Sequence, residues 1–386
     1  MQRSGNQRLE TDTRNKITAL HLLLVGDVGG IETLCRNIGR ASTNRNIFCF
    51  VRTGGVIADE MRQDGIEVHI LNRSSWKMYL QCSSDVERLC KQYHVDLLVI
   101  HHEAPCIWIA AMLIHRKLKI PYIVYAHCNY QDIVRSNHKK SYVKEQLYRK
   151  LLRYASAIIG ISKSVVSSIK RAVPETEAKI RLVYNGIPLQ EYQTNVLTVR
   201  RLAPHIELIY VGRMIPEKGV DSLLDAFADL YKKINRIHLT LVGTGSQMEA
   251  LKRRSRSLQI SEAVLFTGQQ MNVASWLKQA DIFVHPAAWE EGFGLTIVEA
   301  MSAGAITVAV RHGAAEELIE DGVSGFLVDP DDLTKGIWRA IQILGTEQEV
   351  IMRENAVRQA GRFSIETTVA QLERVFQEVL DNESTY

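Results

Sequence analysis

Short apolar runs alternate with longer segments of helical periodicity along most of the chain. In the first half, apolar runs of strand length lie at 19–25, 47–51, 68–71, 97–100, 122–126 and 158–161. Helix-length segments such as 79–94 and 141–154 separate them. Strands that alternate with helices predict a parallel, doubly wound sheet with right-handed crossovers.

The pattern is interrupted over 185–205, where turn-forming residues without clear periodicity indicate a linker. A second series of strand-length runs follows at 208–211, 239–242, 264–266, 282–285 and 306–310. The expected fold class is therefore α/β, with two doubly wound Rossmann-like domains that face each other across a cleft. Ligands of such sheets bind beyond the carboxyl ends of the strands.

The domain boundaries expected from this pattern divide the chain into a leader, two domains, a linker and a final helix. They are a flexible leader at 1–16, an N-terminal domain at 17–190, a linker at 191–205, a C-terminal domain at 206–362 and a C-terminal helix at 363–386 that can cross back to the N-terminal domain. With 386 residues, of which 46% are hydrophobic, the chain can build two substantial cores.

The segments that would direct the chain into or across a membrane are not evident in the sequence. The longest uninterrupted apolar run, 106–114, is about half of a membrane span, and the polar N-terminus has no apolar segment of the export type. All six cysteines lie in the first third of the chain, and none forms a C-x-x-C pair. A reduced, cytoplasmic protein without a cysteine metal site is therefore expected.

Charge is distributed unevenly between the two halves. Residues 1–190 hold 28 Lys and Arg against 16 Asp and Glu, whereas the remainder holds 19 against 27. The basic half indicates contact with an anionic partner such as a membrane surface, a phosphorylated lipid or nucleic acid. Scattered, solvated charge is the alternative interpretation.

A glycine-rich turn, Gly26 to Gly30, follows the first predicted strand and precedes a helix at 31–40. Glycines such as Gly29 and Gly30 let the backbone approach a ligand, and a helix N-terminus offers unpaired N–H groups to an anion. A strand-to-helix turn needs glycine in any case, so these residues alone do not decide between phosphate binding and a purely structural role.

The strand at 208–211 ends in Gly212-Arg213 and is followed by Pro216-Glu217-Lys218-Gly219. Arg213 and Lys218 on one loop after a strand can converge on a diphosphate, the first as a fork and the second as a point charge. Two solvated surface cations are the alternative. A second glycine turn at Gly243 lies on the same predicted edge.

The segment 284–310 carries the densest set of candidate residues. A strand leads to a loop with Glu291, Gly292, Phe293 and Gly294, and a helix then begins near Leu295. The exposed N–H groups of Phe293, Gly294 and Leu295 are expected to face an anion or a sugar hydroxyl. One turn into this helix, Glu299 provides a carboxylate, the natural acceptor for vicinal hydroxyls of a ribose or sugar.

Together, these motifs resemble glycosyltransferase family 4. The resemblance rests on GGIE at 29–32, GRMIPEKG at 212–219, GTG at 243–245, EEGFGLTIVEAMSAG at 290–304 and EELIEDGVSGFLVDP at 316–330. It covers nearly the whole chain after the leader and is most specific in the C-terminal half. Members of this family are retaining enzymes of the GT-B fold, so the resemblance implies both that fold and that activity.

The resemblance also implies roles for individual residues. Arg213 and Lys218 are expected to hold the diphosphate, with the backbone of Gly30 approaching from the other domain. Glu299 is expected to bind the ribose, and Glu291 with the N–H groups after it the donor sugar. The segment Phe266-Thr267-Gly268-Gln269 falls where such enzymes hold the nucleobase through backbone contacts.

A histidine completes the expected active site. His127 ends the apolar run at 122–126, where relatives place a histidine near the transferred sugar and the anomeric centre. His101 and His102, which follow the preceding strand, are alternatives. A lone histidine at the end of a strand is also compatible with a structural hydrogen bond.

The acceptor side is expected in the N-terminal half. Residues 135–153 form a basic amphipathic pattern in which the cations include Lys139, Lys140, Lys144, Arg149 and Lys150. Such a helix can rest on anionic lipid or meet a lipid-diphosphate acceptor, or it can be a core-packing helix with a solvated basic face. No recognised nucleic-acid fold signature accompanies the charge, so no nucleic-acid partner is expected.

The sequence therefore predicts a retaining glycosyltransferase that moves a sugar from a nucleotide-sugar, with UDP favoured, to a saccharide or lipid-linked acceptor. Its expected setting is surface polysaccharide or glycolipid synthesis, at the inner face of the cytoplasmic membrane. No Asp-x-Asp suited to carrying a metal on the donor is found, so no metal or other cofactor is expected. A sugar-nucleotide epimerase on the same fold and a non-catalytic nucleotide-sugar-binding subunit are the alternatives.

Overall fold

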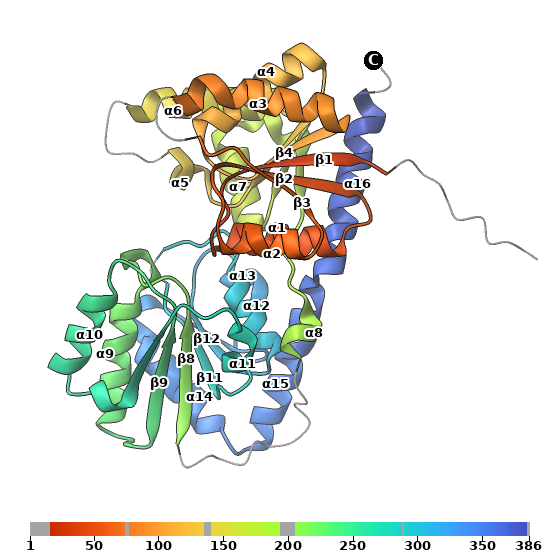
Figure 1. The fold of residues 1–386 in the computed structure, drawn as a ribbon. Coiled ribbons are helices and arrows are strands. Elements are labelled where there is room, and N and C mark those ends of the chain that lie inside the picture. Colours follow the sequence, from red (N-terminus) through yellow and green to blue (C-terminus); the bar gives the residue numbers. More distant parts are fainter. Residues whose placement is uncertain (1–15, 74–76, 135–139, 194–204, 288, 384–386) are drawn as a thin grey trace, which may run out of the picture.

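The computed structural model describes residues 16–73, 77–134, 140–193, 205–287 and 289–383 (Figure 1). The predicted leader at 1–16, apart from its last residue, and most of the predicted linker lie outside the described residues. The chain forms two parallel sheets with helices around each, one sheet in each half (Figure 1).

The first sheet has seven parallel strands in the order β3-β2-β1-β4-β5-β6-β7. Its strands are β1 (Thr18–Val25), β2 (Arg45–Thr53), β3 (Glu67–Ile70), β4 (Leu97–Ile100), β5 (Tyr122–Ala126), β6 (Ala157–Gly160) and β7 (Ile180–Leu182). The helices are α1 (Gly30–Ala41), α2 (Val56–Gln63), α3 (Lys77–Tyr93), α4 (Pro105–Leu118), α5 (Tyr130–Val134), α6 (Lys140–Tyr154) and α7 (Lys163–Ala172). Strands β4, β5 and β6 are buried along their whole length, which is why they are continuous apolar runs.

The second sheet has six parallel strands in the order β10-β9-β8-β11-β12-β13. Its strands are β8 (Ile206–Val211), β9 (Ile237–Val242), β10 (Val264–Gly268), β11 (Ile282–His285), β12 (Ile306–Val310) and β13 (Phe326–Val328). The helices that follow the first domain are α8 (Leu189–Tyr192), α9 (Val220–Tyr231), α10 (Met248–Ser257), α11 (Val273–Leu277), α12 (Leu295–Ser302), α13 (Ala315–Leu318), α14 (Leu333–Ile343), α15 (Glu347–Ala360) and α16 (Ile365–Glu383).

The structure confirms the predicted α/β class with two doubly wound parallel sheets. All eleven predicted strands are present, whereas β7 and β13 were not predicted because three residues are too short to show a period. The segment 185–205, predicted as a linker without regular structure, contains the short helix α8. None of the described helices combines the length and apolar character needed to cross a bilayer.

Helix α16 runs beside both halves of the molecule (Figure 1). It packs on α1, and its Glu373 accepts a hydrogen bond of 2.7 Å from the Ser42 hydroxyl of the first domain. Arg181 donates to Glu378 of the same helix over 3.1 Å. The last helix thus ties the C-terminal half to the edge of the N-terminal sheet.

A buried ion pair supports the helix that carries Glu299. Arg353 of α15 is only 2% exposed and lies 2.8 Å from the Glu349 carboxylate, one turn earlier. The same guanidinium donates to the main-chain oxygen of Gly304, at the end of the turn that follows α12. Its contacts therefore fix α15 against α12 at the floor of the site described next.

Candidate active site

The two sheets approach each other through loops at the carboxyl ends of their strands. A Cβ atom at Gly292 would lie 2.2 Å from the main-chain oxygen of His127, so only glycine allows the loop after β11 to reach the loop after β5. A Cβ atom at Gly30 would lie 3.7 Å from the Leu295 side chain, which places the N-terminus of α1 opposite that of α12. The structure thus brings together residues that the sequence placed in different domains.

Further contacts hold the two halves together at this edge. Glu317 of α13 accepts hydrogen bonds from the main-chain N–H groups of Lys163 and Ser164 at 3.0 and 3.1 Å, at the start of α7. It also accepts one of 2.8 Å from the Tyr184 hydroxyl. The Ser164 hydroxyl donates to Glu290 over 2.7 Å. A carboxylate at the N-terminus of a helix in the other domain is a favourable placement.

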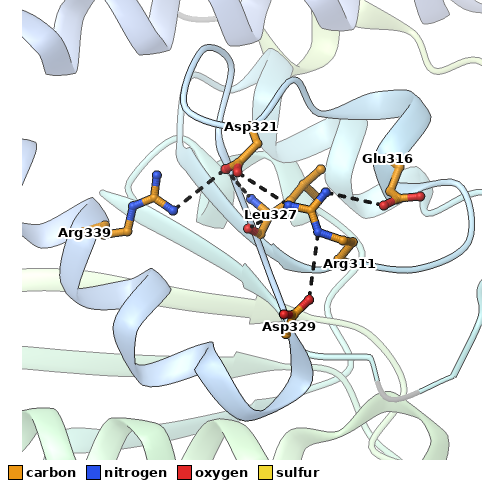
Figure 2. A network of polar contacts seen from close by, with 6 residues as sticks. All are labelled: Arg311, Glu316, Asp321, Leu327, Asp329 and Arg339. Carbon is orange, nitrogen blue, oxygen red and sulfur yellow. Dashed lines mark hydrogen bonds and ion pairs between the residues drawn. The ribbon is translucent and has the colours of Figure 1, made fainter.

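Arg311, which follows β12, lies at the centre of a network of polar contacts next to α13 (Figure 2). Its guanidinium reaches the carboxylates of Glu316 and Asp321 at 3.4 and 3.5 Å and that of Asp329 at 4.0 Å. Arg339 approaches Asp321 from α14 at 3.9 Å. This network connects the loop after β12 to α13, to the turn before β13 and to α14, so it holds α13 in place.

Lys218 and Glu291 form an ion pair at the centre of the site. Lys218 ends the short 3-10 helix Pro216–Lys218 after β8, and Glu291 lies in the loop after β11, the strand next to β8. On the other side of the carboxylate, His285 Nε2 lies 3.5 Å from Glu291 Oε2. Burial and the nearby Arg213 cation lower the pKa of Lys218 to about 8.

Arg213 lies close enough to Lys218 and to the Cys128 thiol to influence both electrostatically. Burial raises the pKa of the Cys128 thiol, and the positive charge of Arg213 opposes this shift. The main-chain oxygen of Arg213 accepts a hydrogen bond of 2.8 Å from the Tyr210 hydroxyl, which fixes the turn after β8. Two cations from the C-terminal half therefore meet beside residues that follow β5 of the N-terminal half.

Helix α12 begins at Leu295, directly after the Glu291 loop, and Gly294 is its N-cap. Gly294 has a φ of 94°, a left-handed conformation that favours glycine, and no side chain of the described residues caps the first turn. Phe293 is buried and packs against Tyr184 and Phe363. The N-terminus of α12 is therefore available to bind an anion through its main-chain N–H groups.

Glu299 lies inside α12 and is 8% exposed. Burial raises the pKa of its carboxyl group to about 7, the charge of Glu191 adds to the rise, and a hydrogen bond from Tyr192 opposes it. Tyr192 belongs to α8, so the side chain that contacts the expected ribose-binding carboxylate comes from the segment between the domains. Sequence reasoning did not identify Tyr192, because the pattern showed no element there.

The predicted glycine turns after β8, β9 and β10 lie against each other. The Gly243 N–H donates to the main-chain oxygen of Gly268 over 2.9 Å. A Cβ atom at Gly243 would lie 2.0 Å from the main-chain oxygen of Gly212. Three adjacent strand ends thus present main-chain groups at one edge of the sheet. Gln269, predicted at the same place, is exposed.

The predicted histidines differ in their surroundings. His102 is engaged near α1, where Nδ1 accepts from the Leu24 N–H at 3.1 Å and Nε2 lies 3.2 Å from Glu32. A Cβ at Gly29 would collide with this same Glu32, so Gly29 allows the carboxylate to fold back over the start of α1. His101 and His127 are both buried and are hydrogen-bonded to each other at 3.0 Å.

The structure also shows polar residues that the sequence alone did not single out. His285 lines a small cavity with Glu291, Trp289 and His312, and its Nδ1 is buried without a hydrogen-bond partner among the described residues. Glu103 follows β4, and burial raises the pKa of its carboxyl group. A hydrogen bond from the Cys128 side chain opposes this rise. His285 ends β11 and Glu103 lies in the loop after β4, and a position at the carboxyl end of a strand is the signal that could have identified them.

The predicted acceptor-side cations are located on α6, in part. Lys139 and the side chain of Lys140 lie outside the described residues. Lys144 lies over the Trp108 ring at 5.9 Å, Arg149 donates to Glu145 over 3.2 Å, and Lys150 is exposed. The neighbouring side chains Tyr142 and Val143 are each 68% exposed. Helix α6 thus exposes apolar and cationic side chains together.

Comparison with known proteins extends this description. A family model described as "Glycosyl transferases group 1" matches residues 202–362, and one described as "Glycosyltransferase Family 4" matches residues 28–191. The two models together match most of the chain. The chain belongs to glycosyltransferase family 4.

Relatives of this glycosyltransferase include the N-acetyl-alpha-D-glucosaminyl L-malate synthase of Bacillus anthracis, 26% identical over 311 residues, or 78% of this chain and 79% of that protein. The alpha-monoglucosyldiacylglycerol synthase of Streptococcus pneumoniae is 27% identical over 262 residues, or 62% of this chain and 57% of that protein. Among solved structures, HepE from Anabaena in complex with UDP and glucose superposes with a TM-score of 0.80 at 22% identity. That match covers 94% of this chain and 100% of the other chain, and it shows that the two facing sheets form the predicted GT-B fold.

Proposed function

We propose that this glycosyltransferase transfers a sugar from a UDP-sugar, with retention of configuration, to a saccharide or lipid-linked acceptor. The observation that carries the proposal is the convergence of Lys218, Glu291 and the N-terminus of α12 at the edge of the cleft. Cations, a carboxylate and free main-chain N–H groups together match the diphosphate and hydroxyl groups of a nucleotide-sugar. The HepE structures that contain UDP, UDP with glucose and UDP-glucose support UDP as the nucleotide.

The diphosphate binds between Arg213, Lys218 and the backbone of Gly30 in this proposal. As the bond to the anomeric carbon breaks, negative charge grows on the diphosphate, and these groups stabilise it in a site from which closure excludes water. Each charge-assisted hydrogen bond contributes roughly 1.5–3 kcal/mol. The two cations then fill the role that a metal ion has in other transferases, so the proposed activity needs no metal.

The sugar and ribose are held from the C-terminal half. Glu291 accepts hydrogen bonds from hydroxyls of the donor sugar. The N–H groups of Phe293, Gly294 and Leu295 donate to oxygens of the same sugar. Glu299 accepts hydrogen bonds from the ribose hydroxyls, and main-chain groups of the Phe266–Gln269 segment hold the base. His127 contacts the sugar from the N-terminal half. The acceptor attacks from the side of the leaving diphosphate, which takes up the acceptor's proton, so the configuration is retained.

The acceptor is proposed to bind against the N-terminal half, near Glu103 and the basic helix α6. One relative is named a glucosyldiacylglycerol synthase, which supports a lipid-linked acceptor. The exposed side chains Tyr142 and Val143 beside Lys144 and Lys150 support a location on the inner face of an anionic membrane. Synthesis of a surface polysaccharide or glycolipid is the setting that follows.

Turnover of nucleotide-sugars by the purified chain tests the proposal. The protein is incubated with UDP-, GDP- or ADP-sugars in EDTA, with a lipid extract as the acceptor, and the nucleoside diphosphate and glycosylated product are measured. UDP release with formation of a product of unchanged anomeric configuration is expected. A nucleotide-sugar altered without any acceptor would instead indicate an epimerase, and activity that EDTA abolishes and Mn²⁺ restores would contradict metal independence.

A further inference from the structure

A row of buried polar side chains crosses the N-terminal sheet and ends at His127. Asn46 lies on β2, His21 on β1, His101 directly after β4 and His127 directly after β5, and these four strands are neighbours in the sheet. The distances are 2.8 Å from Asn46 Oδ1 to His21 Nε2, 2.9 Å from His21 Nδ1 to His101 Nε2 and 3.0 Å from His101 Nδ1 to His127 Nε2. All four side chains are less than 9% exposed.

The amide of Asn46 determines the direction of every hydrogen bond in this row. Its Nδ2 donates to the main-chain oxygen of Asn44 over 3.2 Å, so its Oδ1 faces His21. An amide oxygen only accepts, and His21 Nε2 must therefore carry the proton. Because a neutral imidazole has one N–H, His21 Nδ1 accepts from His101 Nε2, and His101 Nδ1 in turn accepts from His127 Nε2.

Two observations support neutral rings with this polarity. Burial lowers the pKa of His21 to about 4 and of His127 to about 3, and it lowers that of His101 well below its ordinary value. The Cys35 sulfur lies 3.6 Å from His101 Nδ1, and burial raises the pKa of its thiol, which therefore keeps a proton to donate there. The Cys35 thiol is therefore able to donate to an unprotonated His101 Nδ1, as the direction set by Asn46 requires.

From this geometry we infer that Asn46, His21 and His101 are positioning residues that hold His127 as the tautomer protonated on Nε2. The Nδ1 atom of His127 then carries a lone pair, which suits it to accept a hydrogen bond from a hydroxyl of the transferred sugar and not to donate a proton. The use of that lone pair rests on the proposed function, whereas the tautomer itself does not.

Nitrogen-15 NMR of the histidine side chains in the purified, full-length protein tests the inference without any substrate. The His127 signals are assigned by their absence in His127→Ala. The wild type is expected to show a protonated Nε2 and an unprotonated Nδ1 for His127. His21→Phe keeps a ring against Phe48 but removes both hydrogen bonds, and it is expected to give a mixture of His127 tautomers.

Two further variants separate the effect of hydrogen-bond direction on the His127 tautomer from a general disturbance of the structure. In His21→Gln an amide can still donate to Asn46 and accept from His101, so the wild-type tautomer is expected to return. Asn46→Leu removes the terminal acceptor and, like His21→Phe, should mix the tautomers. In an assay of transfer from the nucleotide-sugar, kcat/KM is expected to fall roughly tenfold in His21→Phe, because about one hydrogen bond to the sugar is lost. It is expected to recover in His21→Gln.

A wild-type His127 protonated on Nδ1, or a tautomer unchanged in both His21→Phe and Asn46→Leu, would overturn the inference. The wild-type spectrum decides the first point even where a variant fails to fold. If the tautomer behaves as expected while His127→Ala retains full activity, the chain of hydrogen bonds stands and the proposed contact with the sugar fails.

Discussion

Lys218 and Glu291 neutralise each other across two loops that are 73 residues apart in the chain. The proposed function assigns them different partners, the diphosphate to Lys218 and the sugar hydroxyls to Glu291. Binding of the donor must therefore separate the pair and give each member a new contact. The ion pair keeps both side chains ordered beside α12 and offsets part of the cost of burying their charges.

Replacement of Lys218 should affect the reaction more than the fold. Lys218→Ala removes one charge-assisted contact to the leaving diphosphate, and kcat/KM for the donor is expected to fall roughly 10- to 100-fold. Lys335→Ala, which removes an exposed lysine paired with Asp332, provides a matched control. Steady-state rates of nucleoside diphosphate release measure both variants, and equal rates in Lys218→Ala and wild type would remove Lys218 from the proposed site.

Donor binding should become tighter as the pH rises toward neutrality. The pKa of Glu299 is raised to about 7, so its carboxyl group is largely protonated at pH 6, whereas ribose hydroxyls donate best to the ionised form. Binding then favours ionisation and releases a proton below pH 7. Calorimetry of UDP-sugar binding at pH 6 in buffers of different ionisation enthalpy is expected to show this release. The release should vanish in Glu299→Gln, and its persistence there would assign the proton to another group.

The contact of Glu317 with the N-terminal half should favour a closed cleft. Glu317→Ala removes hydrogen bonds to the start of α7 and to the Tyr184 hydroxyl, and it is expected to lower kcat several-fold and to increase the radius of gyration in solution scattering. Glu354→Ala, at an exposed position of α15, serves as the control. A variant with reduced activity but an unchanged scattering profile would argue against a role in closure.

Loss of one member of the buried Glu349–Arg353 ion pair should destabilise the fold more than loss of both members. Glu349→Gln removes the nearer carboxylate and leaves the buried guanidinium with the more distant Asp281 at 4.0 Å. Loss of one partner of a buried ion pair typically costs about 3–5 kcal/mol, and the midpoint of thermal unfolding is expected to fall by several degrees. The double variant Glu349→Leu with Arg353→Met should recover much of this loss, because neither charge remains buried. A double variant less stable than Glu349→Gln would contradict this explanation.

The basic helix α6 should bind anionic lipid if the proposed location is correct. Lys144→Glu with Lys150→Glu is expected to reduce sedimentation with vesicles that contain phosphatidylglycerol, most clearly at low salt. Charge reversal at Lys252 and Lys335 in the other half, which changes the net charge equally, should leave sedimentation unchanged. Equal losses in both pairs would indicate an effect of net charge without a specific surface.

Much of the fold was predictable because the strands of buried parallel sheets are continuous apolar runs. β4, with the sequence LLVI, is buried at every position and was predicted with its observed bounds. The short strand β7 and helix α8 were missed, because three or four residues cannot display a period. Their positions follow from contacts with other elements and not from local pattern.

The site was predictable where it depends on motifs and unpredictable where it depends on the order of strands. Gly294 lies at the N-cap of α12, at the end of the predicted glycine loop, and Glu299 is buried in the helix that follows. The contact of Tyr192 with Glu299 and the row from Asn46 to His127 involve residues far apart in sequence. Only the arrangement of the sheet and of α8 brings these side chains together.

Direct binding of UDP to the purified chain tests the central claim, a nucleotide-sugar site built on the C-terminal half, most directly. Isothermal titration of wild type, Lys218→Ala, Glu299→Ala and the control Lys335→Ala with UDP in EDTA separates the site from the rest of the surface. The account predicts binding to wild type and Lys335→Ala and an affinity lowered at least tenfold in the other two. Undiminished binding to Lys218→Ala and Glu299→Ala, or no binding of UDP, GDP or ADP to wild type, would contradict it.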